Sequence, residues 1–352
     1  TAHSERAGDR RAAVEHMLSA LASDAPSLAH ELFVPEVFTR DNLPEHLTNS
    51  ELQRSISHLG DLERLHCFLE KVRAGRNVSV GVVGGSVSAG SSSMVRTDQG
   101  GLFHKKMQGW LQQRFPRSHV THFNAAMPAV PPSYMQHCLR LHVPQDADLI
   151  FLEAATNMCG ASDAVGPRQG VDPCIKGRAS VELVLRQLLR FPNAPAVVLV
   201  HVHPYWTMQT PVGWPTKVFK TKGLIKGTKA FKADPGRIKI PWLVPKDFDF
   251  EFHQQWGHGA HEHMVDELAK YYALPSVSLR DVVWHRMKVN ATFHGVTLQQ
   301  LYYDRIHPSN LGHTVLALGL AHLFKHAALL AAAQPPAAAT AATAATAALL
   351  AA

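Results

Sequence analysis

The feature that most constrains the fold of this chain is an alternation between short strand-like runs and longer segments with helical periodicity. The strand-like runs lie at 78–83, 120–124, 149–153, 196–201 and 275–278. Helical patterns follow them at about 102–115, 178–190, 257–272 and 308–326. Parallel strands need crossover connections, so this alternation predicts a parallel sheet with helices on its faces. A chain of 352 residues can hold one such domain plus extensions.

Three regions lie outside this alternation. Residues 1–77 show apolar positions three and four apart up to Gly75, which predicts an N-terminal helical extension. Residues 204–256, rich in Lys, Pro and Trp without a clear period, are interpreted as a long insertion beside the sheet. Residues 329–352 form a low-complexity Ala/Thr tail, more typical of a disordered or partly helical segment than of a membrane anchor. The domain itself is therefore expected at 78–328.

Composition favours an ordinary globular protein. Hydrophobic residues make up 46% of the chain and charged residues 18%, which is not typical of a membrane protein. The formal net charge is +7, but the basic residues cluster in the insertion, so we expect no nucleic-acid partner and interpret the cluster as a solvated loop. Four cysteines lack the CxxC spacing of zinc or redox sites. Cys159 and Cys174 could form a disulfide or remain two thiols, and both alternatives stay open.

The first chemical motif is the glycine-rich segment from Gly84 to Gly90, which directly follows the apolar run at 78–83. Ser86 would stand at the carboxyl edge of a parallel sheet, where open α/β folds bind ligands. Paired glycines allow a sharp turn and leave backbone N–H groups open to a substrate oxygen. Taken alone, a plain Gly/Ser loop is an equally good interpretation.

Two rival motifs fail on the same residues. A phosphate-binding P-loop needs a lysine where this chain has Ser91. The nucleophile elbow of α/β hydrolases, G-x-S-x-G, needs a glycine where this chain has Ser88. Neither nucleotide binding nor an α/β-hydrolase elbow is therefore predicted.

The second motif is Asp304-Arg305-Ile306-His307-Pro308, which precedes the last helical pattern. A carboxylate three residues before a histidine can hold the Nδ1–H of the imidazole and leave Nε2 free to act as a base. Pro308 limits how far the histidine can move. By itself, however, Asp-x-x-His is more often a surface turn or a helix start.

Together, the two motifs resemble the first and last blocks of the SGNH (GDSL-like) hydrolase family. Residues 123–129 look like the family's glycine block, and residues 151–157 look like its asparagine block. All four blocks occur in the family's order, and the resemblance covers residues 78–326. It implies a three-layer α/β/α sandwich with a parallel, flavodoxin-like sheet.

The resemblance also implies roles for individual residues. Ser86 would be the nucleophile, His307 the base and Asp304 the group that orients His307. The oxyanion hole would comprise the backbone N–H groups of Ser86 and Ala129 and the side-chain amide of Asn157. The chain departs from the family pattern at Ala129, where glycine is common, and at Met158, where aspartate is frequent; alanine needs a suitable φ/ψ to present its N–H.

The function that follows is hydrolysis of a carboxylic ester through an acyl-enzyme, without a cofactor or a metal. By family analogy, the substrate would be a small-molecule or carbohydrate ester such as an O-acetyl sugar. A catalytically silent glycan-binding module and an O-acyltransferase remain alternatives.

Other features give weaker expectations. The histidines at 201, 203, 258, 261 and 263 match no zinc signature, so no metal site is expected. The sequons at Asn77 and Asn290 are compatible with the secretory pathway, although no signal-peptide pattern occurs in this chain. We expect no membrane partner, and the sequence leaves the oligomeric state and the localisation open.

Overall fold

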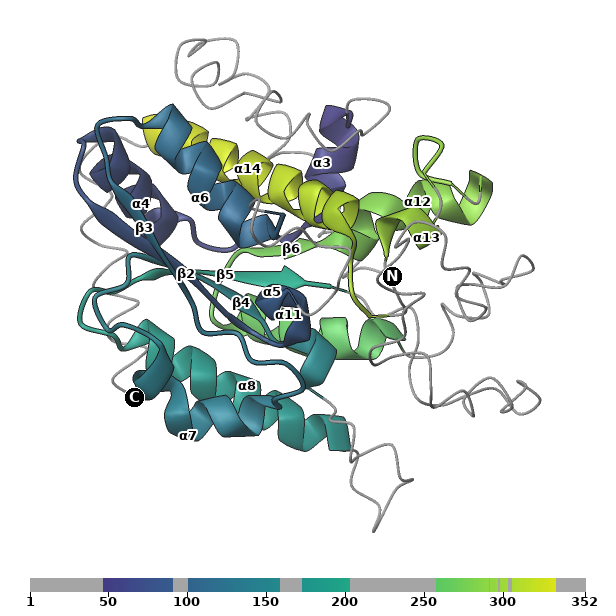
Figure 1. The fold of residues 1–352 in the computed structure, drawn as a ribbon, viewed down its shortest axis with the longest axis horizontal. Helices are drawn as coiled ribbons and strands as arrows, with labels where there is room; N and C mark the ends of the chain where they lie inside the picture. Colours follow the sequence, from purple (N-terminus) through teal and green to yellow (C-terminus); the bar gives the residue numbers. More distant parts are fainter. Residues whose placement is uncertain are drawn as a thin grey trace, which may run out of the picture.

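The computed structural model describes residues 47–90, 101–158, 173–202, 258–290, 292–296, 298–302 and 306–333. Their centre is a six-stranded sheet with helices on both faces (Figure 1). In chain order, the strands are β1 (Ile56–His58), β2 (Val78–Gly84), β3 (Val120–Asn124), β4 (Leu149–Glu153), β5 (Ala196–His201) and β6 (Ser276–Ser278). The expected runs thus form strands with nearly the expected bounds.

The sheet has the topology of a flavodoxin-like fold. Its strand order is β1-β6-β5-β4-β2-β3, and all neighbours are parallel except β1 and β6. Counted along the chain, the parallel strands from β2 to β6 follow the order 2-1-3-4-5. This confirms the expected three-layer α/β/α sandwich. The strand order reverses between β2 and β4, and open α/β folds bind ligands beyond the carboxyl ends of such strands.

Helices cover the two faces of the sheet in separate layers. One layer consists of α4 (Glu63–Arg73), α6 (Phe103–Arg114), α12 (Leu279–Asn290) and α14 (Asn310–Ala333). The other consists of α7 (Pro132–His142), α8 (Pro173–Leu189) and α11 (His258–Tyr271) (Figure 1). The short elements are α3 (Asn49–Ser55), α5 (Ser86–Ala89), α13 (Leu298–Leu301) and the 3-10 helix η4 (Ala155–Asn157).

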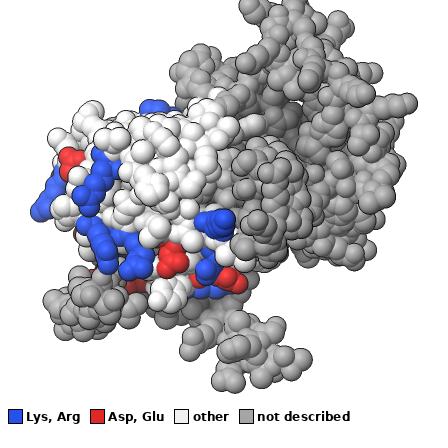
Figure 2. Space-filling model, turned by 90° about the horizontal axis from the view of Figure 1, so that it is seen from below, with Lys and Arg blue, Asp and Glu red and all other residues white. Residues whose placement is uncertain are grey.

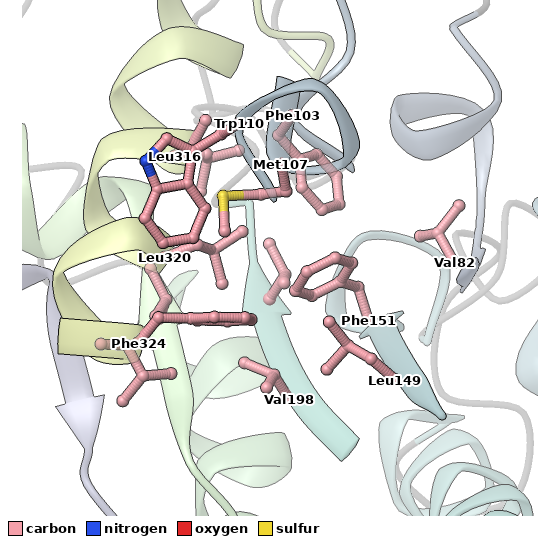
Figure 3. Packing of buried hydrophobic residues seen from close by; sticks show 14 of the residues in the cluster. Val82, Phe103, Met107, Trp110, Leu149, Phe151, Val198, Leu316, Leu320 and Phe324 are labelled. Carbon is pink, nitrogen blue, oxygen red and sulfur yellow. The ribbon is translucent and has the colours of Figure 1, made fainter. Parts of the chain in front are cut away.

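The strands supply both layers of the core because successive side chains point to opposite faces. On β4, Phe151 packs towards α6 and α14, whereas Ile150 and Leu152 pack towards α7 and α8. Aromatic rings join the first layer edge to face, with centroid distances of 5.9 Å for Phe103–Phe151 and 5.9 Å for Trp110–Phe324 (Figure 3). Such pairs each contribute about 1 kcal/mol beyond the burial of their surface.

The N-terminal region differs from the expected helical extension where the structure describes it, over residues 47–77. Residues 56–58 form the edge strand β1, which pairs antiparallel with β6. Leu65, Phe68 and Leu69 of α4 are buried in the core of the first layer. This part of the chain therefore belongs to the sandwich, and the boundary expected at residue 77 is not a boundary of the core.

Helix bounds also differ at two places. The last helix, α14, continues to Ala333 instead of ending near residue 326, and α8 begins at Pro173 instead of near residue 178. Within the described part of the chain, none of the helices is both long and apolar enough to cross a membrane. The insertion at 204–256 and most of the Ala/Thr tail lie outside the described residues.

Candidate active site

Ser86 lies at the carboxyl end of β2, on the turn that the glycine pair allows. The strand ends at Gly84, Gly85 precedes the short helix, and Ser86 is the first residue of α5. The helix ends at Ala89 and is capped by Gly90, whose φ of 75° is the left-handed conformation that favours glycine. Ser86 is half-buried, whereas Ser88 is fully buried. Of these two serines, Ser86 is therefore the one that a substrate can reach.

His307 lies against Ser86 although 221 positions separate the two residues. Its Nε2 is 2.7 Å from Ser86 Oγ, the distance of a hydroxyl that donates to an imidazole nitrogen. The structure thus brings together the nucleophile and the base expected from the two motifs. Asp304, the expected orienting carboxylate, lies outside the described residues.

The chain after His307 is fixed at the start of α14. Ser309 donates its N–H to Leu301 O at 2.8 Å, and its hydroxyl accepts from the Gly312 N–H at 3.4 Å in the manner of a helix N-cap. A Cβ on Gly312 would lie 2.5 Å from Leu301 O, so glycine is needed for this close approach. The sequence from Pro308 to Gly312 thereby holds His307 at the sheet edge.

Asn157 lies beside the Ser86 turn, at the end of η4. A Cβ on Gly85 would meet Asn157 Nδ2 at 1.9 Å, so the amide packs directly against the glycine backbone. Asn157 Nδ2 donates to Val130 O at 3.3 Å. A side-chain amide nitrogen carries two hydrogens, which leaves one for a ligand oxygen.

Ala129 adopts a left-handed backbone conformation, which glycine reaches more easily than other residues. Its φ is 58°, in the left-handed region, at a cost of about 1 kcal/mol for a residue with a Cβ. The loop that carries it is tied to β2, because Met127 donates its N–H to Gly84 O at 2.9 Å. The alanine therefore does not prevent this backbone geometry, although the role of its N–H stays a prediction.

A part-buried network around the buried His104, which the sequence did not indicate, braces the far end of α5. Asn124 Nδ2 lies 3.1 Å from Ser88 O, and His104 Nε2 lies 2.9 Å from the same oxygen. A carbonyl only accepts, so His104 Nε2 carries the proton, and Nδ1 accepts from His122 Nε2 at 2.8 Å. Burial lowers the pKa of His104 well below its usual value, and burial lowers that of His122 to about 4. Both rings are therefore neutral at pH 7.

Several other groups considered in the sequence lie among the described residues. Among the described residues, no cluster of three or more His, Cys, Asp or Glu side chains could hold a metal ion. His201 Nε2 instead lies 3.5 Å from Asp266 Oδ1, inside the fold. His203 and Cys159 lie outside the described residues, so a Cys159–Cys174 disulfide stays a prediction.

On the face that Figure 2 shows, the described Lys and Arg side chains do not form one continuous basic field. They lie along the left and lower edges of the described part in this view, with Asp and Glu side chains among them. The lysine-rich part of the sequence lies within the insertion, outside the described residues.

Similar structures point to the same fold. No family model matches the sequence, and no curated protein matches it. A two-domain esterase (CEX) active on acetylated mannans, co-crystallised with mannopentaose, is similar with a TM-score of 0.54 and 16% identity. A second structure of a two-domain esterase (CEX) active on acetylated mannans has a TM-score of 0.51 and 16% identity. An acetylxylan esterase from Geobacillus stearothermophilus has a TM-score of 0.44 and 13% identity.

The extent of these matches differs between the partners. The first match covers 79% of this chain and 56% of the esterase, and the second covers 78% and 56%. The match with the acetylxylan esterase covers 70% of this chain and 94% of that one. This chain therefore matches only a little over half the length of the two-domain esterase structures. At such identities, the likeness to those two structures shows a shared α/β fold.

Proposed function

We propose that this protein is a serine esterase that cleaves carboxylic esters through an acyl-enzyme. The observation that carries the proposal is the 2.7 Å contact between Ser86 Oγ and His307 Nε2 at the carboxyl edge of the sheet. A serine hydroxyl is a weak nucleophile until a neighbouring base takes its proton. His307 Nε2 would take it, and its 2.7 Å distance from Ser86 Oγ supports this role.

In the first half-reaction, Ser86 Oγ attacks the ester carbonyl carbon while its proton passes to His307 Nε2. The tetrahedral oxyanion would accept hydrogen bonds from the N–H groups of Ser86 and Ala129 and from Asn157 Nδ2. The C–O bond to the alcohol then breaks, and His307 returns the proton to the leaving oxygen.

In the second half-reaction, a water molecule attacks the acyl-enzyme carbonyl and gives its proton to His307. The bond to Ser86 Oγ breaks, the serine recovers its proton from His307, and the carboxylic acid leaves. Asp304 would orient His307 throughout by accepting from its Nδ1–H.

An O-acetyl group on a carbohydrate is the substrate class that we propose. The support is the fold shared with a two-domain esterase that is active on acetylated mannans. Since one fold can host several chemistries, the substrate needs its own test. Release of acetate from acetylated mannan and xylan, measured with unacetylated glycans as blanks, would identify it.

Labelling with a fluorophosphonate tests the nucleophile and the base together, because the probe reacts with a serine activated by a positioned base. We expect one adduct, mapped to Ser86 by peptide mass spectrometry. The adduct should be lost in Ser86→Ala, strongly reduced in His307→Ala and still formed in the neighbouring control Ser88→Ala. An adduct on another serine would refute the assignment of Ser86.

The same experiments separate the alternatives. Folded protein that binds acetylated glycan but forms no adduct and releases no acetate would be a silent glycan-binding module. An acyltransferase would behave differently when an acceptor alcohol is added: acetate release would fall and acetylated product would accumulate. Hydrolysis that is insensitive to the acceptor is the expected result.

A further inference from the structure

A buried carboxyl group lies beneath the turn that carries Ser86, and the reaction described above gives it no role. Glu153 is the last residue of β4, a strand whose 5 residues are all buried, and it is itself 1% exposed. Its register partner on β2 is Gly84. Burying a carboxyl group costs several kcal/mol unless its oxygens are hydrogen-bonded. Its contacts are therefore informative.

Two hydrogen bonds join Glu153 to the Ser86 turn. Glu153 Oε2 accepts from the Gly85 N–H at 3.0 Å and from the Ser88 hydroxyl at 3.3 Å. These donors lie on either side of Ser86 in the sequence. One carboxylate oxygen therefore connects the residue before the nucleophile with the residue two positions after it.

Gly84 and Gly85 have no side chains, and this leaves room for Glu153 and Asn157 to pack against the turn. A Cβ on Gly84 would lie 3.0 Å from Glu153 Oε2 and 2.8 Å from Ser88 Oγ. A Cβ on Gly85 would collide with Asn157 Nδ2 at 1.9 Å. The turn is thus packed between the carboxyl group on one side and the amide on the other.

The short helix α5 is consequently held at both of its ends. Asn124 and His104 bond to the Ser88 carbonyl near its end, and Glu153 bonds to the Gly85 N–H at its start. A helix of one turn has little stability of its own, so its position depends on such contacts. Loss of the Glu153 contact would free the N-terminal side, where Ser86 lies.

The environment of Glu153 disfavours its charge. Burial raises the pKa of the carboxyl group, while the Gly85 N–H, the hydroxyls of Thr156 and Ser88, and the charge of His307 act in the opposite direction.

Glu153 and Asn157 also line a cavity of about 20 Å³, which is room for one water molecule. A glutamine amide could therefore replace the carboxyl group with little rearrangement.

We infer that Glu153 is a positioning residue of the esterase site. Its carboxyl oxygen fixes the Gly85–Ser86 turn so that Ser86 Oγ meets His307 Nε2 while the Ser86 N–H faces the oxyanion. The inference rests on the proposed esterase function. It requires an acceptor oxygen at this position, which both glutamate and glutamine supply.

The test compares Glu153→Met, which removes the acceptor at similar volume, with Glu153→Gln, which keeps it. Misplacing a reacting group by about 1 Å can lower the rate by about 10²-fold, so we expect that loss in kcat for Glu153→Met. KM should stay within about 3-fold of the wild-type value because substrate binding is not removed. Glu153→Gln should restore kcat to within about 5-fold of wild type.

A matched control separates positioning from simple stability. Glu51 is also fully buried and lies on α3, where it bonds to Thr48 and His294. Glu51→Gln should lower the melting temperature and leave kcat per folded molecule unchanged. Wild-type kcat in folded Glu153→Met would overturn the inference, as would a Glu153→Gln enzyme as slow as Glu153→Met.

A measurement independent of turnover keeps this inference distinct from the proposed function. In TROSY spectra of ¹⁵N-labelled protein, the Gly85 and Ser86 amide resonances should move in Glu153→Met and stay near their wild-type positions in Glu153→Gln. Unchanged resonances in Glu153→Met would overturn the inference. Wild-type protein that neither binds the fluorophosphonate nor cleaves any ester would instead refute the esterase proposal, whatever these spectra show.

Discussion

At the scale of single residues, the Asn157 side-chain amide gives the most specific prediction about the reaction. Its Nδ2 bonds to Val130 O and packs against Gly85, beside the serine that would carry the tetrahedral intermediate. Removing one oxyanion donor typically lowers kcat by about 10² to 10³-fold. We expect this loss in Asn157→Ala, measured from initial rates, with KM little changed. Asn193→Ala is the control, since Asn193 bonds to Asp148 away from the site, and an equal loss in both variants would contradict the assignment.

The backbone of Ala129 gives a second prediction at the residue scale. A φ of 58° is tolerated by alanine, is easier for glycine and is strongly disfavoured for a β-branched side chain. Ala129→Val should therefore shift the loop and lower kcat by about 10-fold or more, whereas Ala129→Gly should keep kcat close to wild type. Fluorophosphonate labelling rates would show the same order. Equal rates in the valine and glycine variants would mean that this N–H does not contact the oxyanion.

At the scale of elements, the contact between α8 and η4 positions Asn157. A Cβ on Gly177 of α8 would lie 1.9 Å from Met158 O, the residue after Asn157. Gly177→Ala should push η4 away, lowering both kcat and the melting temperature. Gly109→Ala on α6 is the matched control, because its Cβ would meet nothing within 4 Å. That exposed helix position should gain about 0.5–1 kcal/mol of stability without a change in kcat.

The helices and strands also show how much of the fold could be predicted from the sequence alone. Strands β2 to β6 were predicted from the sequence, and β2, β4 and β5 are apolar runs because most or all of their side chains are buried. Edge strand β1 was missed, since its 3 residues pair only with β6, far along the chain. Helices α7 and α12 were also missed; α7 begins at a proline pair and α12 follows β6 without a break.

The residues of the candidate site were likewise predicted only in part from the sequence. The two motifs indicated Ser86 and His307, and the family resemblance added Asn157. The structure places Ser86 against His307. The roles of Glu153, His104 and Asn124 depend on distances between segments, which residue spacing does not encode. A glutamate that ends a fully apolar strand was the one local signal for Glu153.

At the scale of the whole molecule, buried neutral histidines make stability depend on pH. Burial lowers the pKa of several of them in the folded state. The values are about 4 for His122, about 3 for His313, about 3 for His322 and about 4 for His326, and His104 is also lowered. An unfolded histidine titrates near 6.5, so below that pH the unfolded chain binds more protons and stability falls as pH decreases. For a fully buried histidine such as His313, the loss of stability at pH 5.5 is about 1 kcal/mol.

Two buried carboxyl groups partly offset the loss of stability at low pH. Burial raises the pKa of Glu153 and of Glu262, so their contribution to stability is greatest below the unfolded value and is lost as pH rises through the folded value. More histidines than carboxyl groups shift, and the histidines act over the range from about pH 6.5 down to pH 4. We therefore expect a lower melting temperature at pH 5 than at pH 7.5, measured by scanning calorimetry.

His322→Gln should flatten the slope of unfolding free energy against pH by close to one proton, because it removes one group that protonates only on unfolding. An unchanged slope would show that His322 is already protonated in the folded protein.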